Sequence, residues 1–363
     1  MRKKAPFKVD HGDERTLVRQ VTDGLRRAIV EGYYAPGDLL PSSYSLVDDL
    51  GVSRIVTRAA LRQLAAEGLA VARPRVGTVV RDRGAKLWRG HVVFVYNSAN
   101  IGYFQTAILE TLRSRLNEEG YLFTQAAAFF DTASGKADFS SIDAALSRSV
   151  DLVMAMSSWR QFPGYLARTG VPYAYVAIGK SMTSGVGMTR FDRIRALREM
   201  AEACQANGIR KAVAMHCFHL SSDAERQFRA AGIETRRIVL GPVGSNGDHT
   251  VIERTGFEEF RRMISSGHID HDTLYYFEDD YLARGALMAM AIAGLRAPED
   301  IRVATLANAG FLPAYDRELT RIEIDPKAAG EAAANDALAF LKTGHYPEGN
   351  SVGYKFIRGA TMA

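Results

Sequence analysis

The sequence is poor in cysteine, in long apolar runs and in the glycine motifs of common enzyme families. Its 363 residues contain two cysteines, Cys204 and Cys217, which are too few for a disulfide framework. No apolar run is long enough to span a membrane, and the basic first residues lead into acidic ones instead of an apolar segment. No complete Gly-x-Gly-x-x-Gly, Walker or Gly-x-Ser-x-Gly pattern occurs. We therefore expect neither a secreted nor a membrane protein, and we place the chain in the cytoplasm.

The net charge of +5 is modest, but the positive charge is unevenly distributed. Residues 1–90 hold 17 Lys and Arg against 10 Asp and Glu, whereas the remainder holds 29 against 31. The front quarter is therefore cationic and the rest is slightly acidic. Because contacts to phosphates depend on local positive charge, this distribution indicates nucleic acid as the partner of the N-terminal region and not of the rest.

Residues 48–69 are predicted to form a tight turn followed by a helix. Gly51 permits the turn, and Ser53 is placed to cap the helix start. The positions with inward helical spacing are Thr57, Ala60, Leu61 and Leu64. The outer face, which has no acidic residue, carries Ile55, Arg58 and Arg62, with Arg54 at its flank. Such a helix is typical of DNA recognition in the major groove, although a solvated basic face gives the same pattern.

The segments on either side of this helix complete the pattern of a winged helix. A long helix is predicted over residues 14–31, and a short one opens at Ser42 or Ser43. Between them, residues 32–43 carry Pro-Gly punctuation, and downstream residues 70–80 alternate into a hairpin. Residues 1–13 lack periodicity and are expected to form a flexible basic arm.

At these motifs the sequence resembles the GntR family of bacterial transcription factors, over roughly residues 14–80. The resemblance rests on Pro36-Gly37-Asp38, Leu40-Pro41-Ser42, Leu50-Gly51-Val52-Ser53-Arg54, Arg58, Ala60-Leu61, Leu64, Glu67-Gly68-Leu69 and Gly77-Thr78. A match of this length and spacing is more specific than any single motif. It implies a DNA-binding domain.

The resemblance places DNA contacts at Ser43, Tyr44, Ser53, Arg54, Ile55, Thr57, Arg58, Arg73, Arg75 and Gly77. Several of these depart from the family pattern: Ser43-Tyr44 replace a common Glu-Arg pair, Ile55-Val56 replace polar residues, and Arg75 replaces a glycine. Ile55 suits a thymine methyl group, whereas Arg54 and Arg58 suit either guanine or phosphate. Arg73 and Arg75 suit insertion into a minor groove. The base preference is therefore expected to be unusual.

After a charged, glycine-containing linker at residues 81–90, a second domain over residues 91–363 alternates strands and helices. Strands are predicted at residues 92–96, 122–127, 152–156, 173–178, 212–215, 237–240, 273–277 and 301–306. Helices are predicted at residues 103–119, 193–207, 221–231, 254–264 and 281–293. The winged helix occupies residues 1–80. The predicted fold is α/β with parallel sheets, and its length favours two lobes.

This second domain resembles the LacI-type sensor domain, which is related to periplasmic sugar-binding proteins. The motifs concerned are Tyr103-Phe104, Val150-Asp151-Leu152-Val153, Gly170-Val171-Pro172, Asp192 with Ala196, Gly256-Phe257, Asp280, Ala283, Gly285-Ala286 and residues 293–300. The resemblance implies two lobes that close on a small molecule. It also implies three chain crossings between the lobes, near Phe191, near residues 308–311 and near Asp325.

By the same resemblance, the small-molecule effector is bound by Tyr103, Phe104, Asp192, Glu253, Arg254, Asp280 and Asn308. Ordinary core packing of the aromatic pair and helix capping by Asp192 and Asp280 are the structural alternatives. An arginine common in the family is replaced by Glu253, and an acidic pair is replaced by Ala307-Asn308. We therefore expect a neutral, polyhydroxylated effector such as a sugar in preference to an anion.

Two clusters also permit a metal site. One is His216, Cys217 and His219 at a strand end, which lacks a second cluster at zinc spacing; the other is the acidic run at residues 278–280. Both have simpler explanations, as a strand end and as a sensor motif, so we expect no metal and no other cofactor. We also expect no enzymatic activity. The alternative is a winged helix fused to a catalytic α/β domain, for example a pyridoxal enzyme.

The predicted function is a sequence-specific transcription regulator that acts as a repressor under the control of an effector. The expected partners are palindromic double-stranded operator DNA, a sugar-like effector and a second copy of the chain. Since two-fold dimers gain affinity by pairing half-sites, a homodimer joined mainly through the sensor domains is expected.

Overall fold

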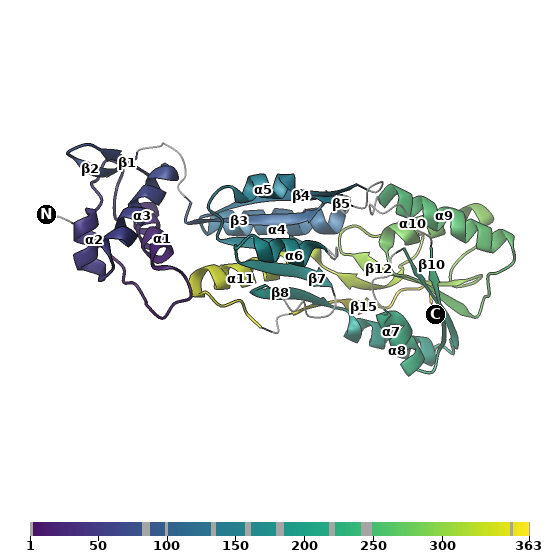
Figure 1. The fold of residues 1–363 in the computed structure, drawn as a ribbon. Coiled ribbons are helices and arrows are strands. Elements are labelled where there is room, and N and C mark those ends of the chain that lie inside the picture. The colour runs from purple at the N-terminus through teal and green to yellow at the C-terminus, as the bar shows by residue number, and fades with distance from the viewer. Residues whose placement is uncertain are drawn as a thin grey trace. The chain divides into compact units, whose positions relative to one another are not determined.

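The computed structural model describes residues 3–81, 88–98, 101–131, 136–156, 161–178, 185–217, 222–240, 249–348 and 351–362. The chain forms two compact units (Figure 1). The first comprises Met1–His91 with Asn117–Leu122, and the second comprises Val92–Leu116 with Phe123–Ala363. Residues 82–87 of the expected linker lie outside the described residues. Within the described residues, no helix is both long and apolar enough to cross a membrane.

Three helices and a hairpin make up the N-terminal unit. They are α1 (Leu17–Val30), α2 (Ser43–Leu50), α3 (Arg54–Ala66), β1 (Ala70–Arg73) and β2 (Gly77–Val80), with β1 antiparallel to β2. Thr16, Ser42 and Ser53 cap the three helices, because each side chain accepts a hydrogen bond from a backbone N–H of the first turn. Gly51 ends α2 in the left-handed region, at φ 67°. The predicted turn and capped helix are confirmed.

The N-terminal arm packs on the core of this unit, so the prediction of a flexible arm is wrong. Ala5, Phe7 and Val9 lie against the apolar cluster that α1, α2 and α3 share. The ring of Phe7 covers Gly24, where an added Cβ would lie 2.4 Å from a ring carbon. Three alternating apolar residues are too short a pattern to recognise in a sequence, but they suffice for packing once a complementary surface is present.

The second unit holds two sheets, one for each lobe. The first sheet has the strand order β14-β8-β7-β6-β3-β4-β5. Its strands are β3 (Gly90–Asn97), β4 (Tyr121–Asp131), β5 (Lys136–Asp138), β6 (Leu152–Met156), β7 (Tyr173–Ile178), β8 (Gly187–Asp192) and β14 (Ser351–Gly353). The helices of this lobe are α4 (Tyr103–Glu118), α5 (Ser140–Leu146), α6 (Gln161–Arg168) and α11 (Pro326–Thr343). From β14 to β3 the neighbouring strands are parallel, whereas β5 is antiparallel to β4.

The second sheet has the strand order β10-β9-β11-β12-β13-β15. Its strands are β9 (Lys211–His216), β10 (Glu234–Val239), β11 (Thr273–Phe277), β12 (Arg302–Asn308), β13 (Thr320–Ile324) and β15 (Lys355–Ile357), and β15 alone among them runs antiparallel to its neighbour. On one side lie α9 (His249–Ser265) and α10 (Asp280–Ala293), and on the other lie α7 (Ile194–Ala206) and α8 (Asp223–Ala230) (Figure 1). These two lobes with largely parallel sheets confirm the predicted fold class.

The chain crosses between the two sheets three times, and two crossings lie where the sequence predicts them. After β8 the chain enters the second lobe at Arg193, and after β13 it returns to the first lobe at Asp325. The crossing predicted at residues 308–311 is wrong, because β12 and β13 are paired neighbours in the second sheet. The third crossing is instead Tyr354, the single residue between β14 and β15.

Candidate nucleic-acid interface and interlobe site

The first candidate site is the exposed face of α3. The side chain of Ile55 is 79% exposed, and Arg54 and Arg58 are exposed beside it. No acidic residue occurs in α3. The opposite face is buried as predicted, with Ala60 and Leu64 fully covered. The helix therefore presents hydrogen-bond donors and an apolar group to solvent, a combination that can read base edges in a major groove.

Thr57 differs from the other predicted DNA contacts because it is buried. Its hydroxyl lies 3.1 Å from Ser43 O and 3.1 Å from Arg54 O, and its side chain has no exposed surface. A direct contact between Thr57 and DNA therefore does not fit the structure, because the residue instead fastens the start of α2 to the start of α3. The hydroxyl of Ser53 accepts a hydrogen bond from the Val56 N–H at 3.4 Å. These two hydroxyl residues hold the start of α3 in place.

The hairpin brings two arginines to an exposed turn. Arg73 and Arg75 are exposed, and the Val76 N–H donates to Arg73 O at 3.1 Å to close the turn. Arg75 has φ 63°, in the left-handed region that favours glycine. Gly77 has φ 124°, and a Cβ added there would lie 2.9 Å from Leu39 Cδ2. Gly77 therefore shapes the wing through its lack of a side chain, whereas the arginines supply the charge.

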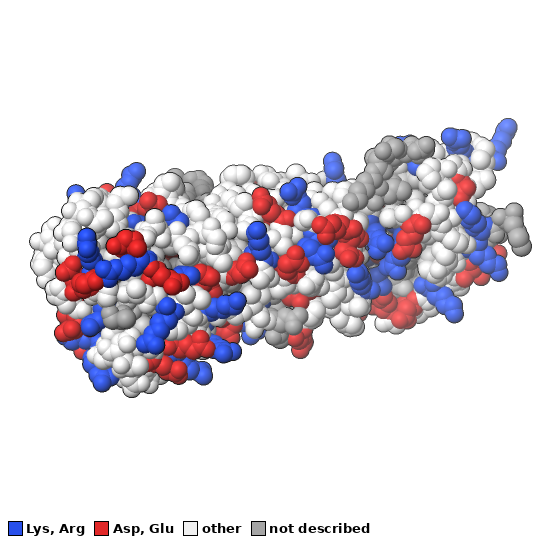
Figure 2. Space-filling view, turned by 180° about the vertical axis from the view of Figure 1, so that it is seen from behind, with Lys and Arg blue, Asp and Glu red and all other residues white. Residues whose placement is uncertain are grey.

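The charge on the second unit is mixed. Figure 2 shows acidic and basic side chains interspersed on the face of this unit that the view presents. This agrees with the near balance of 29 Lys and Arg against 31 Asp and Glu beyond residue 90. That face therefore offers no continuous positive surface to the phosphates of DNA. This favours the N-terminal unit as the site of DNA contact.

The second candidate site lies where the two lobes meet, around Tyr103. This residue begins α4 in the first lobe, and its ring stacks on Phe311 of the second lobe with centroids 4.9 Å apart. Its hydroxyl donates to Ala309 O at 3.1 Å. Phe104, in contrast, packs edge-on against Phe191 of its own lobe at 5.5 Å. Of the predicted aromatic pair, Tyr103 therefore joins the lobes, and Phe104 makes a packing contact within one of them.

Asp280 and Asn308, both predicted effector ligands, form a buried hydrogen-bonded pair. Asn308 Nδ2 donates to Asp280 Oδ2 at 2.9 Å, and Asp280 is 3% exposed. Burial, and then the neighbouring charge of Asp279, raise the pKa of Asp280 to about 6. Asp279 accepts hydrogen bonds from the Tyr281 and Leu282 N–H groups and so caps α10. The capping alternative considered for Asp280 therefore applies to Asp279 instead.

The other predicted effector residues are Asp192, Glu253 and Arg254, and they do not take part in this hydrogen bond. Asp192 is exposed and accepts a hydrogen bond from the Ile194 N–H at 2.9 Å, so it has the structural role of satisfying a donor at the start of α7. On α9, Glu253 is half-buried and Arg254 is exposed. Within the described part of the chain, no hydrogen bond or ion pair links either of them to Asp280.

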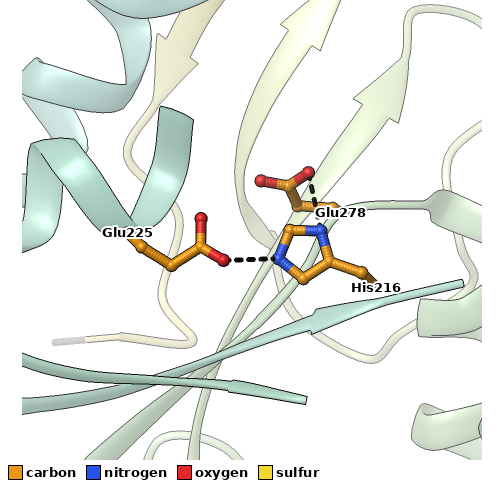
Figure 3. Close-up of side chains that lie close together, drawn as sticks. All are labelled: His216, Glu225 and Glu278. Atoms are coloured by element: carbon orange, nitrogen blue, oxygen red, sulfur yellow. Dashed lines mark hydrogen bonds and ion pairs between the residues drawn. The ribbon is translucent and has the colours of Figure 1, made fainter. Parts of the chain in front are cut away.

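The loop after β11 also brings Glu278 into a buried charge network, which we define as Arg193, His216, Glu225 and Glu278. Figure 3 shows His216 between the two carboxylates: Nε2 lies 3.1 Å from Glu225 Oε1, and Nδ1 lies 3.1 Å from Glu278 Oε2. Arg193, at the first crossing, places Nη1 3.3 Å from Glu278 Oε2. His216 and Glu278 stand at the carboxyl ends of β9 and β11, the edge at which open α/β sheets bind ligands.

The members of the charge network stabilise each other's charged forms. Burial alone would lower the pKa of His216, but its hydrogen bonds to Glu225 and Glu278 outweigh burial and raise it. Burial would raise the pKa of Glu225, but the hydrogen bond to His216 contributes to a net lowering. Glu225 Oε2 and Glu278 Oε1 are buried and make no hydrogen bond within the described residues. These two oxygens can accept hydrogen bonds from the hydroxyl groups of a ligand.

The three side chains of Figure 3 place their ligand atoms within 4.8 Å of one another, which is close enough to surround a metal ion. Two features argue against a metal site. His216 directs its two nitrogens to two different carboxylates, and the guanidinium groups of Arg193 and Arg237 already lie 3.3 and 3.2 Å from those carboxylates. Guanidinium groups therefore supply the positive charge that a metal would bring. His219, from the metal motif considered in the sequence, lies outside the described residues.

Comparison with known proteins finds a family match within each of the two units. Residues 17–80, from α1 to β2, match the family described as bacterial regulatory proteins, gntR family. Residues 219–362, which include the second sheet from β10 onward, match a periplasmic binding protein-like domain. The chain joins a GntR-type helix-turn-helix domain to a periplasmic-binding-protein-like domain. The two resemblances read from the sequence are confirmed.

The GntR-type domain is similar to those of curated regulators. YieP, an uncharacterised regulator of Escherichia coli, is 37% identical over 67 residues, which are 18% of this chain and 29% of that protein. MngR, the mannosyl-D-glycerate transport/metabolism system repressor of the same organism, is 39% identical over 66 residues, 18% of this chain and 28% of MngR. The chain thus spans less than a third of either relative, and these likenesses concern the DNA-binding domain.

The periplasmic-binding-protein-like domain shares its fold with solved LacI-family regulators. One from Bifidobacterium animalis subsp. lactis has a TM-score of 0.59 at 17% identity, over 75% of this chain and 97% of that one. The dimeric Lac repressor has a TM-score of 0.57 at 17% identity, over 75% and 98%. A regulator from Arthrobacter sp. FB24, solved with lactose, has a TM-score of 0.57 at 14% identity, over 76% and 99%. At such identities the likeness establishes the fold alone.

Proposed function

We propose that this protein is a sequence-specific transcription regulator whose affinity for operator DNA is controlled by a small-molecule effector. The observation that carries the proposal is the exposed, acid-free face of α3, held by the Ser53 cap and by Thr57, in a chain that also has a two-lobed sensor fold. In this proposal residues 1–80 bind DNA, residues 81–90 are the linker and residues 91–363 sense the effector. The protein acts in the cytoplasm, as a repressor and without catalysing a reaction.

The proposed effector is a neutral, polyhydroxylated compound, such as a sugar or a sugar derivative. Acceptor oxygens gather at the carboxyl edge of the second sheet, on Glu225, Glu278 and Asp280. These carboxylates would repel an anionic ligand, whereas the hydroxyl groups of a sugar can donate hydrogen bonds to them. The Arthrobacter regulator that shares the sensor fold was solved with lactose, which supports a sugar.

The proposed assembly is a homodimer on a palindromic operator, joined through the sensor domains. On α10, Met288 and Ile292 are 52% and 70% exposed, and their spacing of four residues places them on one face of the helix. Two large apolar side chains on one exposed helix face suit contact with a second copy of the chain. A dimer also lets two recognition helices bind two half-sites.

The DNA-binding part is tested by selecting bound duplexes from a random pool with the full-length protein. We expect one palindromic sequence to emerge. Arg58→Ala should then weaken binding to it by about 1 to 3 kcal/mol if Arg58 contacts a guanine bidentately, and by a similar amount on all sequences if it contacts a phosphate. Arg198→Ala, which removes an exposed arginine of the sensor, is the matched control. Unchanged affinity in both Arg54→Ala and Arg58→Ala would contradict the recognition-helix assignment.

The effector part is tested by a thermal-shift screen of sugars, followed by operator binding with and without the compound that shifts the melting temperature. Coupling between effector and DNA is typically about 1 to 3 kcal/mol. It should be present in the wild type and absent in Asp280→Ala, whose affinity for DNA without effector should be unchanged. Full response in Asp280→Ala would show that the effector binds elsewhere. Conversion of the compound to a product would support the alternative of a catalytic domain.

A further inference from the structure

We propose that Tyr44 is a specificity-determining residue, which holds the guanidinium group of Arg54 in position to read a base pair. Tyr44 is the second residue of α2, and Arg54 is the first residue of α3. The Cζ atom of Arg54 lies 4.1 Å from the centroid of the Tyr44 ring. This is a close cation–π contact between the two helices of the helix-turn-helix. The inference rests on the proposed DNA-binding function.

The contact leaves the hydrogen-bonding edge of Arg54 free. Within the described residues, the guanidinium group of Arg54 makes no hydrogen bond or ion pair, so the ring of Tyr44 is what restrains it. Both side chains reach solvent, with Tyr44 61% exposed. A guanidinium group held by a cation–π contact keeps its N–H donors available, and two of them can form parallel hydrogen bonds to one partner.

The backbone that carries the Tyr44 ring is held against α3. Thr57 of α3 donates to Ser43 O, in the residue directly before Tyr44, and the Gly51 turn connects the two helices. The backbone of Tyr44 therefore keeps its place relative to α3, which keeps the ring within reach of Arg54. Since a flexible arginine loses conformational freedom when it binds, one that is already held against a ring loses less and is better placed for a bidentate contact. The bidentate partner that matches this geometry in a major groove is guanine.

Ile55 extends the same reading surface. It follows Arg54 directly and is 79% exposed. An exposed aliphatic side chain next to a preorganised arginine suits the methyl group of a thymine. The arrangement therefore favours a half-site that contains both a guanine and a thymine, and it makes base reading, not phosphate contact, the role of Arg54.

The test compares the wild type with Tyr44→Phe, Tyr44→Ala, Arg54→Ala and the double variant Tyr44→Ala/Arg54→Ala, on duplexes selected by the full-length protein. Tyr44→Phe keeps the ring and should bind as the wild type does. Tyr44→Ala should weaken binding to the selected duplex about two- to fivefold, the change expected for an exposed cation–π contact. The Tyr44→Ala variant should also show a weaker preference for the guanine over other bases. Its affinity for unrelated duplexes should equal that of the wild type. In the Arg54→Ala background, Tyr44→Ala should have no further effect.

Two outcomes would overturn the inference. If Tyr44→Ala weakens binding equally in the presence and absence of Arg54, the ring contacts DNA itself and does not act through the arginine. If Arg54→Ala weakens all duplexes alike and lowers the slope of log affinity against log salt by about one, Arg54 contacts a phosphate. Tyr33→Ala, at another exposed tyrosine of the same unit, controls for stability, and melting temperatures confirm folding. If the wild type selects no duplex, the proposed function fails instead.

Discussion

At the scale of single residues, His216 gives the clearest pH dependence. Its pKa is raised in the folded state, because its hydrogen bonds to Glu225 and Glu278 outweigh burial. The imidazolium therefore contributes fully to stability below about pH 6.5, and this contribution is lost as the pH rises through the folded-state pKa. We expect His216→Gln to lower the free energy of unfolding by about 3 kcal/mol at pH 6, as for a broken buried ion pair, and by less at pH 9.

Urea unfolding at the two pH values measures this difference. His271→Gln is the matched control, since His271 is an exposed histidine of the same lobe. Equal destabilisation at pH 6 and pH 9 would contradict a charged His216 in the folded protein.

Ionisation of Asp280 should destabilise the fold, whereas ionisation of His216 stabilises it, and both groups make stability fall as the pH rises. The pKa of Asp280 is raised from 3.8 to about 6, so the folded state keeps a proton that the unfolded chain releases. Stability therefore falls as the pH rises from about 4 to 6 and stays reduced above that range. Asp280→Asn removes this titration and keeps an oxygen for Asn308. We expect the variant to be more stable than the wild type at pH 7, by at most about 3 kcal/mol, and equally stable below pH 4.

Thermal unfolding between pH 4 and pH 8 provides the measurement for Asp280→Asn. Asp272→Asn, at an exposed aspartate of the same lobe, should show no such change across the range. A variant that is less stable than the wild type at every pH would mean that Asp280 is charged and stabilising in the folded state.

At the scale of elements, the wing combines local strain with charge. Arg75 adopts φ 63°, which costs a residue with a side chain roughly 1 to 2 kcal/mol and costs glycine almost nothing. Arg75→Gly should therefore raise the free energy of unfolding by about 1 kcal/mol. It should also weaken DNA binding, because it removes an exposed cation from the wing. Denaturant unfolding and operator titration measure the two effects, with Arg73→Gly as the control without a positive φ. Unchanged DNA affinity of Arg75→Gly would contradict a DNA contact by Arg75.

The elements that the sequence predicts best are those with strong local signals. The strands at Leu152–Met156, Tyr173–Ile178 and Thr273–Phe277 have the predicted bounds, because each is a short apolar run between polar segments. The helix Pro326–Thr343 was not predicted. Its many alanines give little contrast between a buried and an exposed face, although Asp325 and Gly344 cap its two ends.

The charge network could not be predicted from the sequence, for a different reason. Its members come from four separate segments: a chain crossing, a strand end, a helix and a loop. No spacing along the chain connects Arg193 with Glu278, and His216 alone resembles a metal ligand as much as an ion-pair partner. The helix face with Arg54, Ile55 and Arg58 was predictable, in contrast, because helical periodicity alone separates it from the buried face.

At the scale of the whole molecule, the proposed dimer depends on the outer face of α10. Replacing Met288 and Ile292 by glutamate would place two charges in the contact on each side, so we expect the dimer dissociation constant to rise at least about tenfold. Sedimentation at micromolar concentration measures the change, and operator affinity should fall with it. Phe129→Glu, at an exposed aromatic residue of the first lobe, should leave the dimer intact. A wild-type protein that is monomeric at this concentration would contradict the proposal.

The third crossing has a consequence for synthesis. Residues 351–357 supply β14 to the edge of the first sheet and β15 to the edge of the second, so neither sheet is complete until these residues have left the ribosome. The winged helix and the arm that packs on it come from a contiguous early segment, Ala5–Val80, and their apolar core contains none of these residues. During translation, the winged helix can therefore fold while the sensor is still incomplete, and under the proposed function its DNA binding in that interval is outside the control of the effector.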